Sequence, residues 1–316
     1  MRHMRIWRYV DEVARAGSLR QAAERLNITA SALQRRVQDV EEDLGTALFE
    51  RLPTGMRLTA AGETFIRWVR SQASDLERVQ SQIEDLSGLR RGIVRIACSQ
   101  ALAAFLLPKE IAAFTTAHPM VHFAVSVRDH KRAVAMLCDY EADLALVFQP
   151  DRYPQFEPLM EVGQRLMAIM AADHPLALQK ILRFRDCAAF PLALLDRSFG
   201  GRQIADGIIG GGSTRFDIRV EANSAEFLRN YVARTQAITL QIEFGALPDM
   251  LGEALVARPI DDREQMHGSL VLGQLRGRNL PIAAAKFANQ LTRRLDALRT
   301  MPVEGASRVD APLTGA

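Results

Sequence analysis

The chain has 316 residues, of which 48% are hydrophobic and 24% are charged. These proportions are typical of a globular protein of two or three domains and exclude disorder as the main state. Lys and Arg outnumber Asp and Glu by 40 to 37, and the resulting net charge of +3 does not by itself indicate nucleic-acid binding.

The sequence predicts a protein of the cytoplasm. No apolar run approaches the roughly 20 residues that cross a bilayer, and the first residues mix charges with apolar side chains, unlike a signal peptide. The chain has three cysteines, an odd number, and none of them forms a CxxC motif: Cys98, Cys138 and Cys187. This favours a reducing compartment and argues against a disulfide or zinc framework. We therefore expect no metal, no resident cofactor and no membrane partner.

The first 60 residues contain three short helical patterns separated by turns. Gly17 ends the first, and Ser18 with Gln21 forms a capping-box pattern at the start of the second. The second runs to Leu26, and Thr29 is expected to cap the third. Two short helices joined by a tight turn predict a helix-turn-helix.

The third helix, residues 30–44, is expected to have one apolar and one polar face. The apolar positions are Ala30, Leu33, Val37, Val40 and Leu44. The opposite face carries Ser31, Gln34, Arg35 and Gln38, flanked by Arg36. Hydroxyl, amide and guanidinium groups read base edges in a major groove, and Arg also contacts phosphates. A solvated surface carries the same residue types, so this helix alone leaves both interpretations open.

Residues 49–51 and 56–58 are expected to form two short strands around a turn of Pro, Thr and Gly. A hairpin after a helix-turn-helix is a wing. Arg51, Thr54 and Arg57 on this hairpin could contact backbone phosphates or the minor groove.

Residues 16–63 resemble the N-terminal domain of the LysR-type transcriptional regulators. The positions that match the family pattern are Ala22, Ala23, Leu26, Leu33, Arg35, Val37, Glu41, Leu44, Gly45, Leu48, Phe49, Arg51, Leu58, Thr59 and Gly62. The resemblance implies a winged helix-turn-helix over residues 1–59 that binds double-stranded operator DNA. Where the family usually has Ser-Gln-Pro and, further on, Ser, this chain has Thr29-Ala30-Ser31 and Gln34, so its operator is expected to differ.

Residues 60–88 are expected to form a linker helix that Thr59 caps. Its apolar residues are spaced by three and four, with Gln72 as the one interruption. The predicted dimerisation strip is Phe65, Val69, Leu76, Val79, Ile83 and Leu86. Packing on its own domain is the alternative. The resemblance favours antiparallel pairing of two linker helices in a dimer, with a tetramer as a dimer of dimers.

Residues 89–300 predict an α/β region of two lobes, followed by a disordered tail over 301–316. Strands are expected at 93–97, 121–127, 144–148, 165–170, 191–195, 217–221, 237–241 and 269–275. Helices are expected around 101–116, 131–138, 202–210, 225–234 and 282–298. Lobe I would contain about 93–164 and 266–300, and lobe II about 165–265. This arrangement resembles the family's effector domain, which is similar to a periplasmic binding protein.

Ligands of such sheets bind beyond the carboxyl ends of the strands. The effector-binding residues expected there are Ser99, Gln100, Arg128, Phe148, Ser198, Phe199, Arg202 and Asn223. Family members commonly place Ser or Thr at the position of Ser99; the others could equally be ordinary loop residues. Small carboxylates would suit the Ser, Asn and Arg residues, and a neutral ligand remains open.

One departure from the family concerns the turn after residue 232. Relatives often carry two glycines where this chain has Thr235 and Ala237. Glycine relaxes the backbone where a helix leads into a strand, so we expect this turn to be built differently and the neighbouring cleft to be reshaped.

The sequence contains no GxSxG, Walker or HExxH motif, so an enzymatic function has no support from motifs. We expect a LysR-type regulator gated by a small metabolite between the lobes, with DNA, the effector and a second copy as partners and RNA polymerase as a further candidate. Two alternatives remain. One is an α/β small-molecule-binding protein or enzyme without DNA function; the other is a ligand-independent DNA-binding regulator.

Overall fold

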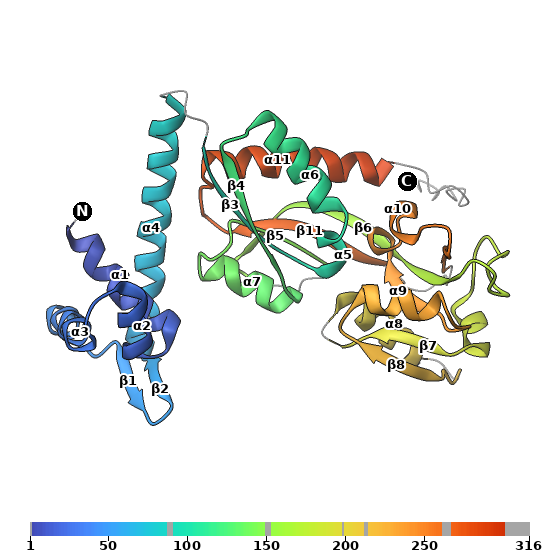
Figure 1. Ribbon diagram of the computed structural model, residues 1–316, viewed down its shortest axis with the longest axis horizontal. Coiled ribbons are helices and arrows are strands. Elements are labelled where there is room, and N and C mark those ends of the chain that lie inside the picture. The colour runs from blue at the N-terminus through green and yellow to red at the C-terminus, as the bar shows by residue number, and fades with distance from the viewer. Residues whose placement is uncertain are drawn as a thin grey trace, which may run out of the picture. The chain divides into compact units, whose positions relative to one another are not determined.

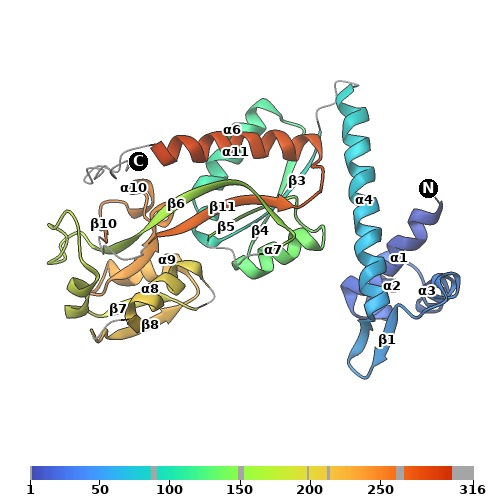
Figure 2. The ribbon, with the colours of Figure 1, turned by 180° about the vertical axis from the view of Figure 1, so that it is seen from behind.

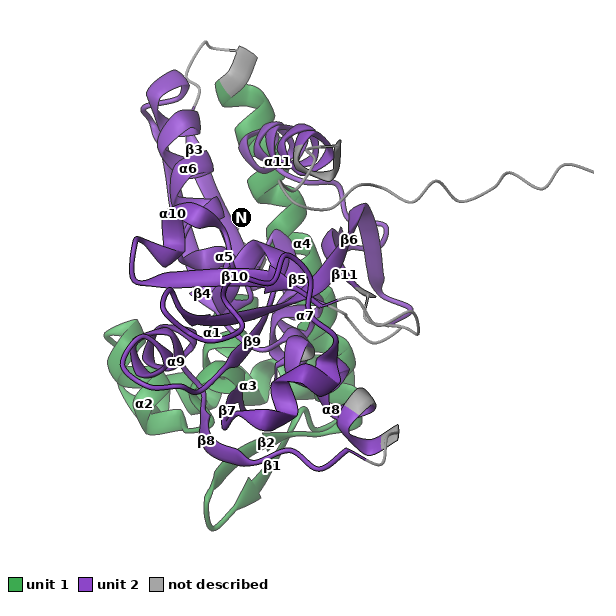
Figure 3. Cartoon of the chain, turned by 90° about the vertical axis from the view of Figure 1, so that its right-hand side faces the viewer, with its two compact units in different colours: residues 1–87 green, residues 88–316 purple. Residues whose placement is uncertain are grey.

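The chain divides into two units, residues 1–87 and 88–316, which Figure 3 shows in different colours. The computed structural model describes residues 2–86, 91–148, 153–197, 199–211, 214–260 and 267–300. The predicted site residue Ser198 and the predicted disordered tail therefore lie outside the described residues.

The first unit is a winged helix-turn-helix followed by one long helix (Figure 1). Its elements are α1 (Arg2–Ala16), α2 (Leu19–Leu26), α3 (Ala30–Leu44), β1 (Phe49–Leu52), β2 (Gly55–Leu58) and α4 (Ala60–Leu86). Both predicted caps form, since Ser18 Oγ accepts from the amide of Gln21 at 3.5 Å and Thr29 Oγ1 from that of Ala32 at 3.2 Å. Thr59 caps α4 in the same way, accepting from the amide of Gly62 at 3.0 Å.

The core of this unit joins the three short helices to the wing and to α4. Its buried residues are Val10, Val13, Ala22, Ala23, Leu33, Val37, Val40, Leu48, Phe49 and Ile66. The predicted apolar face of α3 is shorter than expected, because Ala30 and Leu44 at its two ends are exposed. Gly62 is required by close packing, since a Cβ there would lie 2.0 Å from the carbonyl oxygen of Leu48.

The helix α4 is attached to α1 along its first half. Arg70 donates to Asp11 at 2.7 Å, and Trp68 meets Trp7 edge to face at 4.6 Å between ring centroids. The predicted dimerisation strip is therefore corrected at its start: Phe65 packs against the core of the winged domain and Val69 is buried within the chain. Val69 is therefore closed to a second copy, whereas Phe65 keeps part of its side chain exposed.

The first lobe of the second unit is a mixed sheet with helices on both faces (Figures 1 and 2). The strands β3 (Gly92–Cys98), β4 (Val121–Val127) and β5 (Leu144–Phe148) are parallel, whereas β11 (His267–Leu275) runs antiparallel to β5 and to β6 (Phe156–Ala171). The helices are α5 (Gln100–Ala103), α6 (Leu106–Ala117), α7 (His130–Cys138) and α11 (Ile282–Thr300). The single helix expected around 101–116 is thus two helices.

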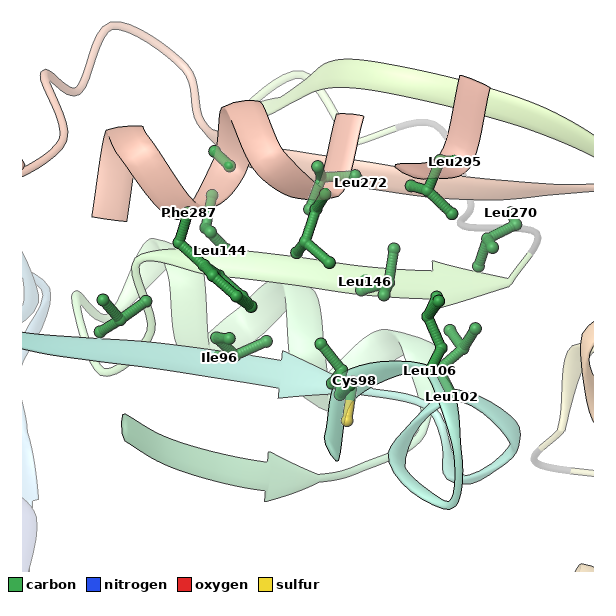
Figure 4. Packing of buried hydrophobic residues seen from close by; sticks show 14 of the residues in the cluster. Ile96, Cys98, Leu102, Leu106, Leu144, Leu146, Leu270, Leu272, Phe287 and Leu295 are labelled. Atoms are coloured by element: carbon green, nitrogen blue, oxygen red, sulfur yellow. The ribbon is translucent and has the colours of Figure 1, made fainter. Parts of the chain in front are cut away.

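Successive side chains of a strand point to opposite faces of the sheet, and two apolar clusters therefore lie on the two faces of this one. Leu144 and Leu146 pack with Phe287 and Leu295 of α11, as Figure 4 shows. Ala145 and Val147, one residue out of phase, join the cluster that includes α7. Such two-sided burial is what the continuous apolar run of β5 predicts.

The second lobe is built around the far half of β6. That half pairs with β9 (Thr239–Ile242) and with β10 (Leu255–Pro259), a strand the sequence analysis did not predict. The strands β7 (Leu192–Leu195) and β8 (Ile218–Ala222) pair in parallel beside them. The remaining elements are η1 (Phe184–Ala189), α8 (Gly200–Gly211), α9 (Ala225–Val232), η2 (Glu243–Gly245) and α10 (Pro248–Leu251).

The strand β6 crosses from one lobe to the other without a break. Its residues up to Arg165 pair with β11, and those from Leu166 onward pair with β9 and β10. The boundary placed between 164 and 165 from the sequence therefore lies inside a continuous strand. Within the described residues, no helix is long and apolar enough to span a membrane.

The turn that lacks the family's glycines is held by side chains instead. Thr235 Oγ1 donates to the carbonyl of Tyr231 at 3.0 Å and accepts from the amide of Ala237 at 3.3 Å. The ring of His174, 3% exposed, lies 3.3 Å from the carbonyl oxygen of Gln236 through Nε2 and accepts from the amide of Leu176 through Nδ1. A threonine hydroxyl and a buried imidazole thus order a turn that relatives form with glycine.

Candidate DNA interface and ligand cleft

The polar face of α3 is open to solvent, as its pattern predicted. Ser31, Arg35, Arg36 and Gln38 are exposed, and Gln34 is partly buried. Arg36 lies over the ring of Tyr9 at 5.1 Å, whereas Arg35 has no ion-pair partner among the described residues. Arg35 is therefore the guanidinium group on this face that is best placed to reach a partner molecule.

The first residues of α3 contribute to the same surface. Thr29 and Ala30 are exposed at the start of the helix. The Thr29 hydroxyl accepts from the amide of Ala32 and lies 3.2 Å from the Ser31 hydroxyl, so it is partly used as the helix cap.

The wing presents two arginines with different surroundings. Arg51 lies on β1 and Arg57 on β2, and both are exposed, as is Thr54 in the turn between them. Arg57 donates to Glu50 at 2.7 Å, while Arg51 has no ion-pair partner within the described part of the chain. A groove of about 440 Å³ separates α3 from the wing and is lined by Gln34, Gln38 and Arg51 among others.

Glu41 fixes the wing to α3, a role that the sequence analysis missed. Its Oε1 accepts from the amides of Leu48 at 2.7 Å and Phe49 at 3.2 Å. These are the residues through which the chain enters β1, so this carboxylate positions the wing beside the exposed face of α3. In the sequence, Glu41 is simply a glutamate near the end of a helix, and only its match to the family pattern could have pointed to this contact.

A cleft lies between the two lobes of the second unit, beyond the carboxyl ends of their strands. The residues that line it are Ser99, Gln100, Ala101, Phe148, Leu195, Phe199, Gly201, Ala225, Leu240, Gln241 and Ile242. Four of the predicted effector-binding residues are thus brought together there: Ser99, Gln100, Phe148 and Phe199. Gln241 was not predicted, although an amide inside an apolar strand is a detectable signal.

The lobes are joined across this cleft by a hydrogen bond. Gln100, at the start of α5 in lobe I, accepts through Oε1 from the amide of Ala225 at 3.0 Å. Ala225 is the first residue of α9 in lobe II. The bond ties the start of one helix to the start of the other.

Three other predicted residues do not line the cleft. Arg202 is 4% exposed, and its guanidinium group donates to Asp206, Glu221 and the carbonyl of Leu195, each at 2.7 Å. Burial lowers the pKa of Arg202, but its hydrogen bonds to the two carboxylates outweigh that effect and the net pKa is raised. Arg128 is exposed and donates to the carbonyl of Val127, and Asn223 is exposed.

Cys98, at the end of β3, is fully buried. Desolvation by burial raises the pKa of its thiol to about 12, so the thiol stays protonated near neutral pH. Its side chain packs with the lobe I core (Figure 4).

The comparisons with known proteins identify the class of this chain. Residues 4–63 match the family model described as bacterial regulatory helix-turn-helix protein, lysR family, and residues 87–296 match the LysR substrate binding domain. The chain therefore belongs to the LysR family, as its motifs predicted.

Two of the similar proteins are bacterial transcriptional regulators. The chain is 30% identical over 200 residues to the RuBisCO operon transcriptional regulator of Allochromatium vinosum, covering 63% of this chain and 66% of that one. It is 35% identical over 176 residues to the HTH-type transcriptional regulator CbbR of Sinorhizobium medicae, covering 55% of each. The matched segments thus span between about half and two thirds of these relatives.

Solved structures share the fold over nearly the whole chain. A full-length OxyR variant from Pseudomonas aeruginosa has a TM-score of 0.67 at 18% identity, covering 98% of both chains. Full-length CbnR in complex with its target DNA has a TM-score of 0.60 at 20% identity, covering 92% of this chain and 99% of that one.

Proposed function

We propose that this protein is a sequence-specific DNA-binding transcriptional regulator whose activity is gated by a small molecule bound between its lobes. The observation that carries the proposal is the exposed polar face of α3 beside an arginine-bearing wing. Recognition helices read base edges with such side chains, while basic groups nearby contact phosphates.

The named relatives support the same function. The curated proteins are described as transcriptional regulators, and the CbnR structure contains its target DNA. A regulator acts where the chromosome is, so we assign this protein to the cytoplasm.

The proposed interface uses α3 for sequence and the wing for position. Ser31, Gln34, Arg35 and Gln38 would face base edges, with Thr29 and Ala30 at the end of the helix that enters the groove. Arg36, Arg51, Thr54 and Arg57 would contact backbone phosphates, which add affinity without specificity.

The second half of α4 would pair two copies. Val79 and Ile83 are 40% and 58% exposed, and Leu76 is partly exposed one turn earlier. Leu86 belongs to the same predicted strip, but its side chain lies outside the described residues. A dimer would place two winged domains on two half-sites, and a dimer of dimers or contact with RNA polymerase would build on that unit.

A ligand bound in the cleft would change the relative positions of the two lobes and, through them, the affinity for DNA. Coupling of this kind is typically about 1–3 kcal/mol, enough to change promoter occupancy severalfold. The hydrogen bond between Gln100 and Ala225 is a contact that such a ligand would alter, because both residues line the cleft.

Selection of genomic fragments tests the proposal. Purified full-length protein is mixed with sheared DNA from its own source, and the bound fragments are recovered and sequenced. We expect a small set of sites with paired half-sites one helical turn or a multiple of it apart. Uniform recovery of all fragments by folded protein would contradict sequence-specific regulation and favour the enzyme or binding-protein alternative.

A further inference from the structure

The cleft between the lobes contains unused hydrogen-bonding groups but no charged side chain among its described lining residues. Ser99 Oγ and Gln241 Nε2 are buried and have no hydrogen-bond partner among the residues that the structure describes. Gln241 as a whole is 2% exposed, so its amide is a buried donor that the described part of the chain leaves unsatisfied. Buried polar groups are almost always paired, so two unsatisfied groups in one cleft mark a place where a ligand or water would bind.

The rest of the described lining is largely apolar. Two aromatic rings and three aliphatic side chains contribute to it: Phe148, Phe199, Leu195, Leu240 and Ile242. A molecule that fits this wall needs apolar surface together with a group that accepts a hydrogen bond from Ser99 or Gln241.

Arg202, which directly follows a lining residue in the sequence, is already paired with carboxylates. Arg202 follows the lining residue Gly201, but its guanidinium group is bound by Asp206 and Glu221 and donates to the carbonyl of Leu195. An anionic ligand would have to compete with two carboxylates for this charge. Arg128, the other predicted arginine, is exposed and does not line the cleft.

The N-terminus of α9, which contributes Ala225 to the cleft wall, already uses two of its amides. The amide of Ala225 donates to Gln100, and that of Phe227 donates to the Ser224 hydroxyl at 3.2 Å. These are two of the amides with which α9 could have held an anion. Arg202 and these two amides of α9 are therefore already satisfied within the protein.

Size limits the ligand further. The cleft offers a volume of about 40 Å³ in this conformation. One water molecule needs about 10–15 Å³ on this scale, so the space suits a ligand of a few heavy atoms. An ionised carboxylate placed there without a cation would lose its hydration without compensation, whereas an uncharged oxygen needs only one donor.

We propose that the effector of this protein is a small, uncharged, mainly apolar molecule with one hydrogen-bond-accepting oxygen, such as a short amide, ketone or alcohol. This inference rests on the proposed function and specifies the ligand class of its cleft. Of the two ligand classes that the sequence left open, small carboxylates and neutral molecules, this inference selects the neutral one.

Matched pairs of an amide and the corresponding carboxylate test the inference, because the members of each pair differ mainly in charge. The pairs run from acetamide and acetate to isobutyramide and isobutyrate, at equal ionic strength and neutral pH. Binding to the full-length protein is measured by ligand-observed saturation-transfer NMR and by the shift in Tm. We expect the amides of the sizes that fit to bind at least tenfold more tightly than their carboxylates.

Two variants locate the binding. Ser99→Ala and Gln241→Leu should each weaken amide binding about fivefold, the change expected for one neutral hydrogen bond. Thr116→Ala, which removes an exposed hydroxyl from α6, is the control and should leave amide binding unchanged. Because a folding defect could imitate the loss, each variant is first compared with the parent protein by circular dichroism.

Preferential binding of carboxylates, equal binding within pairs, or no binding by any amide would each overturn the inference. Selection of genomic fragments with the same preparation separates this failure from that of the proposed function. Specific DNA binding without amide binding would leave the regulator intact and remove only the ligand class.

Discussion

Arg51 and Arg57 lie on the two strands of the wing and differ in what their guanidinium groups contact. Arg57 is held by Glu50 at 2.7 Å, whereas Arg51 has no ion-pair partner within the described residues. Exposed ion pairs are weak, but a phosphate must still compete with Glu50 for Arg57.

We expect Arg51→Ala to weaken DNA binding more than Arg57→Ala. Removing a phosphate contact lowers affinity on all sequences and reduces the slope of log K against log salt by about 1. Titrations of each variant on the selected DNA at several salt concentrations measure both effects. A larger loss with Arg57→Ala would show that the wing contacts DNA mainly through β2.

His174 is a second residue with a specific consequence. Burial lowers its pKa from the usual 6.5, and its hydrogen bond to Gln236 and the charge of Asp173 only partly oppose that shift. The neutral ring is therefore the form that fits the folded protein, where Nδ1 accepts from the amide of Leu176.

The sign of the pH effect follows from this lowered pKa. Below about 6.5 the unfolded chain takes up a proton at this position before the folded chain does, so the free energy of unfolding falls as the pH falls. We expect His174→Gln to flatten that dependence in denaturant titrations at successive pH values. His122→Gln, at an exposed position of β4, is the control; an equal flattening by both variants would contradict a special role for His174.

At the scale of elements, α4 has two parts with different partners. Its first half packs on α1 through Arg70 and Trp68, while Val79 and Ile83 in its second half are exposed. Exposed apolar side chains at this spacing indicate a helix that pairs with another helix.

We expect Ile83→Glu to convert dimers into monomers, because it would bury a carboxylate in an apolar interface. Gln80→Glu adds the same charge at an exposed position outside the predicted strip and should leave the dimer intact. Sedimentation velocity over a range of concentrations distinguishes the two species. A persistent Ile83→Glu dimer would remove this strip from the proposed interface.

At the scale of the whole molecule, the sequence predicted the elements better than the contacts between them. Periodicity and caps placed α1 to α4, the wing and most strands, because these depend on neighbouring residues. The strand β10 and the full length of β6 were missed, since they depend on pairing between segments far apart in the chain.

The candidate site shows the same limit. Ser99, Gln100, Phe148 and Phe199 were predicted from their places after strands or at a strand end, and they line the cleft. Arg202 follows the same rule in sequence, yet its side chain turns to Asp206 and Glu221. The order of residues along the chain does not reveal that a charge is already paired. Nor does it reveal that Glu41 accepts from the amide of Leu48, or that His174 accepts from the amide of Leu176.

The most direct test of the central claim is the affinity of the Arg35→Ala variant for a selected DNA site. Fluorescence anisotropy is measured on that site and on unrelated DNA, with Lys180→Ala, an exposed position of lobe II, as the control for loss of one positive charge. If α3 reads bases, Arg35→Ala loses about 1–3 kcal/mol of specific affinity while Lys180→Ala loses none. Unchanged specific affinity of folded Arg35→Ala protein would contradict the assignment of α3 as the recognition helix.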